Sequence, residues 1–108
     1  MSEYSVAELV QKIPSRFQPD AAEGVDIVIQ FMIDDADDFF IDIAKQSCSA
    51  EIGEHDDPNL TLLTDMTTVH DVLNGRIGGM SAFLKGRLKA EGNVRLASNL
   101  SKYFKKSS

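Results

Sequence analysis

The residues best suited to bind a metal ion form an acidic run at positions 34–38, where four of the five residues are aspartates. A calcium-binding EF-hand loop needs oxygen ligands at its first, third, fifth and twelfth positions and a glycine at its sixth. Counted from Asp34, the third, sixth and twelfth positions are Ala36, Phe39 and Lys45. The spacing does not match, so we expect a solvated turn that binds no metal.

Histidine side chains could serve in metal binding or in acid–base catalysis, and the chain has two, His55 and His70. A zinc site needs three or four ligands, and these two histidines fall in different predicted elements without a recognised ligand spacing. The pair Gly78 and Gly79 alone does not make a phosphate-binding loop. The sequence therefore indicates no catalytic residue, no metal and no cofactor. A small enzyme with an Asp or His acid–base group stays open as an alternative, because such groups meet only in space.

Compartment and partners follow from cysteine content and charge. Cys48 is the only cysteine, so no intramolecular disulfide can form, which is typical of a reducing compartment. Neither a signal peptide nor a membrane-spanning run is visible, and we expect a cytoplasmic protein. The net charge of −6 argues against a nucleic-acid partner. The basic residues Lys102, Lys105 and Lys106 could make transient contact with a membrane surface or could simply be solvated.

Apolar periodicity predicts a helix at the start of the chain and strands after it. Ser5 and Glu8 form a capping-box pattern, and Pro14 should end or kink the helix that follows. From residue 25 to residue 33 apolar residues occupy every second position, which is typical of a strand. Residues 39–44, 48–53 and 60–64 are read as strands as well. The short turns between these four segments predict an antiparallel meander.

Helical spacing returns at residue 65, and a second short helical segment covers residues 78–86. Residues 87–91 alternate and predict a fifth strand. Asn93 would then cap a last helix with its apolar side chains on one face and its basic ones on the other. The apolar face consists of Leu96, Ala97, Leu100, Tyr103 and Phe104. This order of elements in 108 residues predicts a single α+β domain spanning positions 1–108.

Residues 86–93, followed by Leu96, Ala97 and Leu100, resemble the sterol carrier protein 2 (SCP2) family. Members of that family carry a Gly-Lys-apolar-Lys-x-Lys-Gly-Asp strand and then a helix with Leu-Ala and a later Leu and Phe. Residues 60–62 likewise match the family's fourth strand. The resemblance implies a five-stranded, mostly antiparallel sheet with helices covering one face. It also implies an apolar tunnel between the sheet and the C-terminal helices.

The resemblance further implies a domain that binds lipids, and could transfer them, without catalysis. The ligand would be a fatty acid, a fatty acyl-CoA, a phospholipid or a sterol. The residues that match the tunnel lining are Phe31, Ile33, Ile77, Met80, Phe83, Leu84, Leu88, Leu96, Leu100 and Phe104. The sequence does not identify the cation that would meet a headgroup, and Arg76, in the region of the tunnel, is a candidate. An alternative is a non-catalytic accessory subunit of a lipid-modifying pathway. The sequence makes no prediction of oligomeric state.

Overall fold

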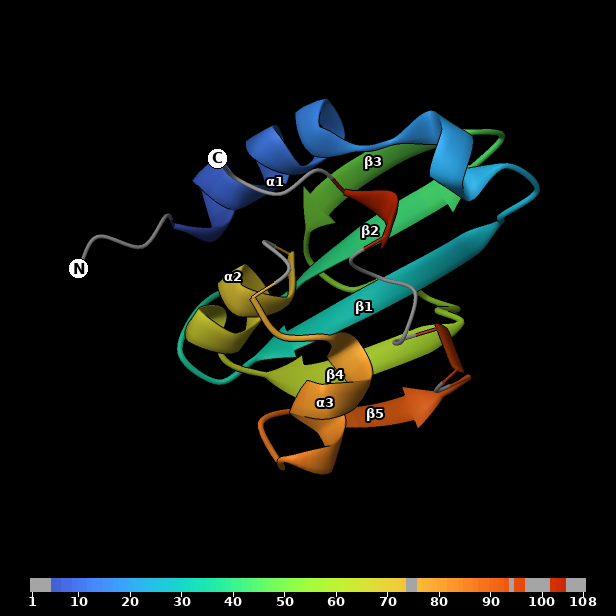
Figure 1. Ribbon diagram of the computed structural model, residues 1–108. Coiled ribbons are helices and arrows are strands. Elements are labelled where there is room, and N and C mark those ends of the chain that lie inside the picture. The colour runs from blue at the N-terminus through green and yellow to red at the C-terminus, as the bar shows by residue number, and fades with distance from the viewer. Residues whose placement is uncertain (1–4, 74–75, 94, 97–101, 105–108) are drawn as a thin grey trace.

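The helices of the protein lie on one face of a five-stranded sheet (Figure 1). This arrangement comes from a computed structural model that describes residues 5–73, 76–93, 95–96 and 102–104. Among these residues no helix is long and apolar enough to cross a membrane. The α+β class that the sequence predicts is confirmed.

The first helix, α1 (Val6–Arg16), begins at the capping box that the sequence indicates. The Ser5 hydroxyl oxygen accepts a hydrogen bond from the Glu8 N–H at 3.2 Å, and the Glu8 carboxylate accepts one from the Ser5 N–H, also at 3.2 Å. These two bonds satisfy N–H groups that no helical carbonyl can reach. Pro14 lies inside the helix, which ends two residues later, and the 3-10 turn η1 (Pro19–Ala22) leads to the sheet.

The strands are β1 (Ile27–Ile33), β2 (Phe39–Ala44), β3 (Ser47–Ile52), β4 (Leu60–Thr64) and β5 (Lys89–Gly92). Their order across the sheet is β3-β2-β1-β4-β5. The period-two pattern predicts their faces correctly, because every second residue of β1, β2 and β4 is buried against the helices. The edge strand β3 is exposed or half-buried throughout.

The predicted antiparallel meander is wrong at its fourth strand. After β3 the chain crosses back over the sheet, and β4 pairs in parallel with β1, with Leu60 opposite Ile29. The sheet is therefore mixed, although its other three strand pairs are antiparallel. We call residues 53–59, which join β3 to β4, the crossing segment. So short a segment does not suggest a crossover in the sequence, because the connections that lead to parallel pairing are usually longer.

Gln30 holds the crossing segment against the face of the sheet opposite the helices. Its side chain is only 3% exposed. Its amide nitrogen donates to the carbonyl oxygens of Phe39 at 3.1 Å and Gly53 at 3.0 Å, and its amide oxygen accepts the N–H of His55 at 2.7 Å. The Phe40 ring packs edge-on against the His55 ring, with centroids 5.2 Å apart. This buried amide fixes the path by which β4 reaches β1.

Two helices follow β4, α2 (Met66–Leu73) and α3 (Gly79–Leu84). The Asp65 carboxylate accepts the Thr68 N–H at 2.7 Å and so caps the start of α2. The pair Asn74 and Gly75, which in the sequence is typical of the end of a helix, lies outside the described residues. In Figure 1, α2 lies in front of β1, and α3 lies in front of the β4–β5 side of the sheet.

The predicted last helix is wrong at its C-terminal end. Lys102 and Tyr103 adopt a 3-10 conformation, and Phe104 forms an isolated antiparallel bridge with Phe17. The Gln18 N–H donates to the Tyr103 carbonyl at 2.7 Å, and the Gln18 side-chain amide donates to the Lys102 carbonyl at 3.0 Å. These carbonyls are bound by the segment after α1 instead of by a following helical turn. Residues 97–101 lie outside the described part of the chain.

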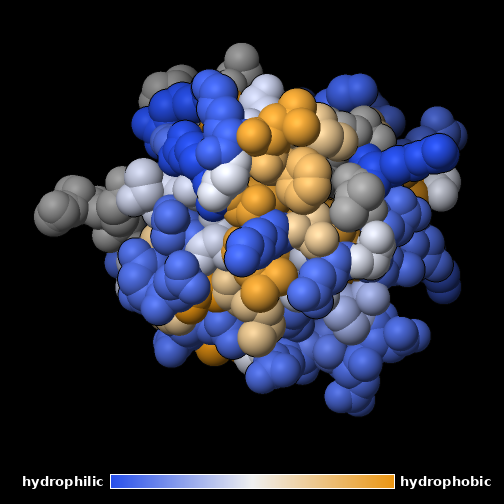
Figure 2. Space-filling model, turned by 90° about the horizontal axis from the view of Figure 1, so that it is seen from below, coloured by the Kyte–Doolittle hydropathy of each residue, from blue (hydrophilic) through white to orange (hydrophobic). Residues whose placement is uncertain are grey.

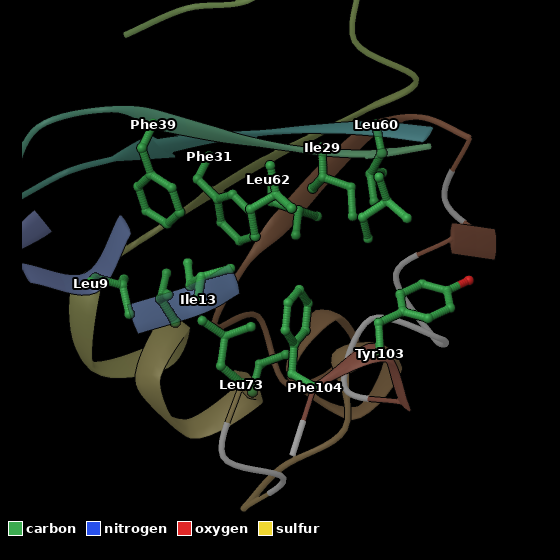
Figure 3. Close-up of a cluster of buried hydrophobic side chains, with 14 of the residues drawn as sticks. Leu9, Ile13, Ile29, Phe31, Phe39, Leu60, Leu62, Leu73, Tyr103 and Phe104 are labelled. Carbon is green, nitrogen blue, oxygen red and sulfur yellow. The ribbon is translucent and has the colours of Figure 1, made fainter. Parts of the chain in front are cut away.

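The hydrophobic core lies between the sheet and the layer of helices. Two rings of the sheet, Phe31 and Phe39, stack with centroids 4.6 Å apart. Figure 3 shows the core side chains of the sheet, Ile29, Phe31, Phe39, Leu60 and Leu62, and those of the opposite layer, Leu9, Ile13, Leu73, Tyr103 and Phe104. A ligand that binds between the sheet and the helices would have to enter this core.

Candidate functional site

A small apolar cavity lies between the sheet and α2. Its volume is about 10 Å³, which is about the space that one water molecule needs. It is lined by Phe31, Leu62, Thr64, Thr68, Val69, Val72, Leu73 and Leu88. Within the described residues this cavity is much smaller than an open lipid tunnel. A lipid chain could occupy it only if the cavity widened.

Four of the ten residues expected to line a tunnel are buried in the core. Phe31 and Leu88 line the cavity itself, from β1 and from the residue before β5. Ile33 and Phe104 are buried in the same core but do not contribute to the cavity wall. Of these four residues, two therefore line the cavity and two lie elsewhere in the core.

Three further expected residues lie nearer the surface or outside the described chain. Ile77 and Leu96 are half-buried and pack against the core. Leu100 belongs to the residues that the structure does not describe. Neither Ile77 nor Leu96 lines the small cavity.

The remaining three expected residues lie on the surface of α3. Met80 is 37% exposed, Phe83 39% and Leu84 76%. The expectation placed them inside a tunnel, but the inward positions of α3 are occupied by Gly79 and Ala82, which are both buried. Helical spacing groups Met80, Phe83 and Leu84 on one face, but it does not say which way that face points.

The contribution of α2 to the cavity was not predicted from the sequence. Val69, Val72 and Leu73 form its helical side, with Thr68 beside them. The signal was present, because helical spacing already predicts an apolar face on this segment. That face looks the same in the sequence whether it packs against a solid core or borders a cavity.

A cluster of charges joins the end of α2 to the loops on either side of α3. The Asp71 carboxylate accepts from the Arg76 guanidinium at 3.0 Å and from the Arg87 guanidinium at 2.7 Å. Two guanidinium groups thus share one carboxylate, which leaves a net positive charge. The Arg76 side chain is largely exposed, so a headgroup could reach it. This geometry is compatible with the role that the resemblance suggests for Arg76, and does not test it.

A polar cleft of about 320 Å³ opens beside the apolar cavity at the β4–β5 edge of the sheet. It is lined by Asp34, Leu63, Thr64, Asp65, Gly86, Arg87, Leu88 and Lys89. Thr64 and Leu88 also belong to the wall of the apolar cavity. The Thr64 hydroxyl donates to the Arg87 carbonyl at 3.1 Å and so joins the two sides of the cleft. Thr64 and Leu88 therefore border both the cleft and the cavity.

The sequence model of the SCP-2 sterol transfer family matches residues 7–105. This chain belongs to that family. The match covers α1, the whole sheet and both later helices, so the resemblance found in residues 60–62 and 86–100 is confirmed. No curated protein sequence matches the chain significantly.

Solved structures share the fold of this family member at low sequence identity. Palmitated SCP2L2 from Aedes aegypti aligns with a TM-score of 0.70 and 21% identity, covering 92% of this chain and 93% of that one. The UbiJ-SCP2 ubiquinone synthesis protein aligns with a TM-score of 0.72 and 9% identity, covering 90% and 85%. These identities establish a common fold and nothing further.

An enzyme also contains the fold of this SCP-2 family member. The sec-alkylsulfatase Pisa1 from Pseudomonas sp. aligns with a TM-score of 0.86 and 14% identity. The alignment covers 97% of this chain but only 17% of the alkylsulfatase chain. The present sequence therefore corresponds to a small part of that enzyme.

The two histidines have different surroundings in this family member. The His55 ring nitrogen Nδ1 accepts the Asp57 N–H at 3.0 Å within the crossing segment, and His70 is buried on α2. Within the described ranges, no three His, Cys, Asp or Glu side chains are grouped so that they could hold a metal ion. The absence of a metal and of a catalytic residue stays a prediction.

The thiol of Cys48 should react slowly in the native protein. Burial, with a smaller contribution from the negative charge of Asp42, raises the pKa of Cys48 from 9.0 to about 12. Because the thiolate is the reactive form, a rise of that size lowers its fraction at pH 8 by about a thousandfold.

Ellman's reagent at pH 8 measures this effect as the ratio of rates in native and in guanidinium-unfolded protein. Above pH 9 the unfolded state loses the proton first, so burial of the thiol should also make the native state less stable as the pH rises from 9 towards 12. Cys48→Ser is the control without a thiol. Equal rates in the native and unfolded protein would contradict the burial of this group.

Proposed function

We propose that residues 1–108 form a single non-catalytic domain that binds lipids, and transfers them, by accepting an apolar chain between the sheet and α2. The observation that carries the proposal is the apolar cavity at this layer boundary. Membership of the SCP-2 sterol transfer family supports it. The single cysteine and the acidic net charge support a cytoplasmic location and argue against a nucleic-acid partner.

Binding requires the cavity to widen, because about 10 Å³ is far too small for a lipid chain. Each methylene that leaves water contributes about 0.8 kcal/mol, so a long chain gains enough to offset a displacement of α2. The ligand then selects a conformation in which α2 is further from the sheet. This mechanism predicts a preference for long acyl chains over short, soluble carboxylates.

The ligand class that we favour is a long-chain fatty acid or another lipid with an acyl chain. A relative by fold, SCP2L2 from Aedes aegypti, is described as palmitated. In this chain the polar cleft lies directly behind Thr64 and Leu88, where a headgroup could remain in water while the chain enters the cavity. Native mass spectrometry of the purified protein would reveal a co-purified ligand as an adduct of lipid mass.

Enlarging Val72 should block ligand uptake. Val72→Phe adds volume to the α2 wall of the cavity, and overpacking of this kind typically costs about 1–3 kcal/mol. If the substitution destabilises the widened, lipid-bound state by this amount, the affinity for a fluorescent acyl probe should fall about tenfold. Titration of the folded variant with the probe measures the change.

Two further variants make this test specific. Val10→Phe makes the same substitution at a half-buried position of α1 away from the cavity, and it should leave probe affinity within about twofold of the wild type. Val72→Ala removes volume from the wall and should keep or increase affinity. If wild-type protein binds no probe, or if all three variants bind it equally, the cavity is not the lipid site.

A second candidate function is that of an accessory module for an enzyme that acts on amphiphilic molecules. It is favoured by the alignment in which 97% of this chain covers 17% of a sec-alkylsulfatase. In that case the domain would hold an apolar substrate or contact a partner enzyme without performing catalysis itself. A folded protein that binds no acyl probe but co-purifies with one enzyme would favour this candidate.

A further inference from the structure

The helix α3 is packed with its small residues inward and its large apolar residues outward. Gly79 and Ala82 face the core and are buried. Met80, Phe83 and Leu84, which we call the α3 surface, are 37%, 39% and 76% exposed. A surface helix usually turns its large apolar side chains towards the core. The reversed arrangement indicates that the outer face of α3 meets an apolar environment outside the protein.

In Figure 1, α3 lies at the bottom of the molecule. Figure 2 views the molecule from below and shows an apolar area that hydrophilic side chains border on most sides. Apolar areas with a polar rim are typical of sites that contact a membrane or a partner. The charges next to the α3 surface distinguish between a membrane and a protein partner.

The charges next to the α3 surface are basic, although the chain as a whole is acidic. Residues 76–90 contain four basic side chains and no acidic one, in a protein of net charge −6. Arg76 precedes α3, and Lys85 and Arg87 follow it. Asp71 is shared by both arginines and offsets only one of them. Asp71, Arg76, Lys85 and Arg87 together therefore carry a net positive charge on either side of α3.

We propose that the α3 surface docks the protein on membranes that contain anionic phospholipids. Exposed aromatic and aliphatic side chains would enter the boundary between headgroups and acyl chains, and the bordering cations would bind lipid phosphates. The location of these groups beside the polar cleft, which Arg87 also lines, would bring the site of lipid entry to the membrane. The inference rests on the proposed function, because docking on a membrane would serve lipid uptake.

The same charges argue against a second copy of this chain as the occupant. A twofold contact through the α3 surface would place each residue near its own counterpart or near neighbours of it. Arg76, Lys85 and Arg87 of one copy would then approach the same basic residues of the other. Like charges brought together in this way oppose association, whereas an anionic membrane neutralises them.

Sedimentation with vesicles tests the apolar part of the proposal. Wild-type protein should bind vesicles of phosphatidylcholine with about one-third phosphatidylglycerol, and should bind pure phosphatidylcholine vesicles at least tenfold more weakly. The double variant Phe83→Ser, Leu84→Ser should lose at least tenfold in binding to the anionic vesicles. Ile52→Ser is the matched control, because Ile52 is an apolar residue that is 47% exposed on β3.

A pair of charge variants tests the electrostatic part. Lys85→Glu should weaken binding to anionic vesicles several-fold and leave binding to neutral vesicles unchanged. Lys45→Glu makes the same charge change at an exposed lysine in the β2–β3 turn and should have little effect. Since all substituted residues are exposed or partly exposed, the variants should fold. Circular dichroism and the thermal transition check that they do.

The outcomes separate this proposal from the proposed function. Wild-type protein that takes up a soluble acyl probe but does not bind anionic vesicles would overturn the docking and leave lipid binding in place. Vesicle binding without probe uptake would support the docking and reject the cavity as the lipid site. Vesicle binding that survives the Phe83 and Leu84 substitutions would overturn the α3 assignment. A dimer in sedimentation velocity that the double variant dissociates would assign this surface to a second copy.

Discussion

Replacement of Gln30 by alanine should lower the free energy of unfolding by about 3 kcal/mol, because it leaves several buried polar groups without partners. The Gln30 amide satisfies the carbonyls of Phe39 and Gly53 and the N–H of His55. A methyl group can replace none of these bonds. The loss should also loosen the crossing segment, which joins β3 to β4. Urea denaturation followed by circular dichroism measures the difference.

The matched control for this prediction is Gln46→Ala. Gln46 is exposed, and its side-chain amide makes one hydrogen bond, to the Pro19 carbonyl at 3.2 Å. Its replacement should change the stability by no more than about 0.5 kcal/mol, as is usual at the surface. If Gln30→Ala were equally mild, the crossing segment would not depend on the buried amide.

Replacement of Gly92 by alanine should be about as damaging, at roughly 2–4 kcal/mol, because strain and a backbone clash add together. Gly92 ends β5 with a φ of 96°, which side chains of L-residues disfavour. A Cβ atom there would lie 2.6 Å from the Asn59 carbonyl oxygen. That oxygen also accepts the Asn93 N–H at 3.0 Å. Relief of the clash would separate β5 from the start of β4.

Gly24→Ala separates the two causes. Gly24 has a φ of 76°, and a Cβ atom there would meet no atom within 4 Å. It should therefore show the conformational penalty of about 1 kcal/mol without the clash. Thermal denaturation of both variants gives the comparison. Equal losses at Gly24 and Gly92 would mean that the Asn59 contact contributes nothing to the effect.

The strands and the first helix could be predicted because their signals are local. The capping box at Ser5 and Glu8 and the alternation in β1 depend on residues close in the sequence. The parallel partner of β1 could not be predicted in this way. It depends on the path of the crossing segment, which Gln30 of β1 holds in place by hydrogen bonds to Gly53 and His55.

The candidate site was only partly accessible to sequence reasoning. Phe31 and Leu88, two residues chosen by matching to the SCP2 family, line the cavity, and their part in lipid binding stays a prediction. The same matching placed Met80 and Phe83 there as well, although their helix turns them outward. Apolar periodicity describes a face, and the direction of that face depends on which neighbours it meets.

By itself the sequence determined the α+β class, the buried face of each central strand and the family, because these follow from periodicity and short motifs. Tertiary structure alone decided the parallel pairing of β4 with β1, the 3-10 conformation of Lys102 and Tyr103, the bridge at Phe104 and the outward direction of α3. Each of these depends on contacts between distant segments. The carbonyls of Lys102 and Tyr103, for example, are bound by Gln18, so the local preference for a helix does not prevail there.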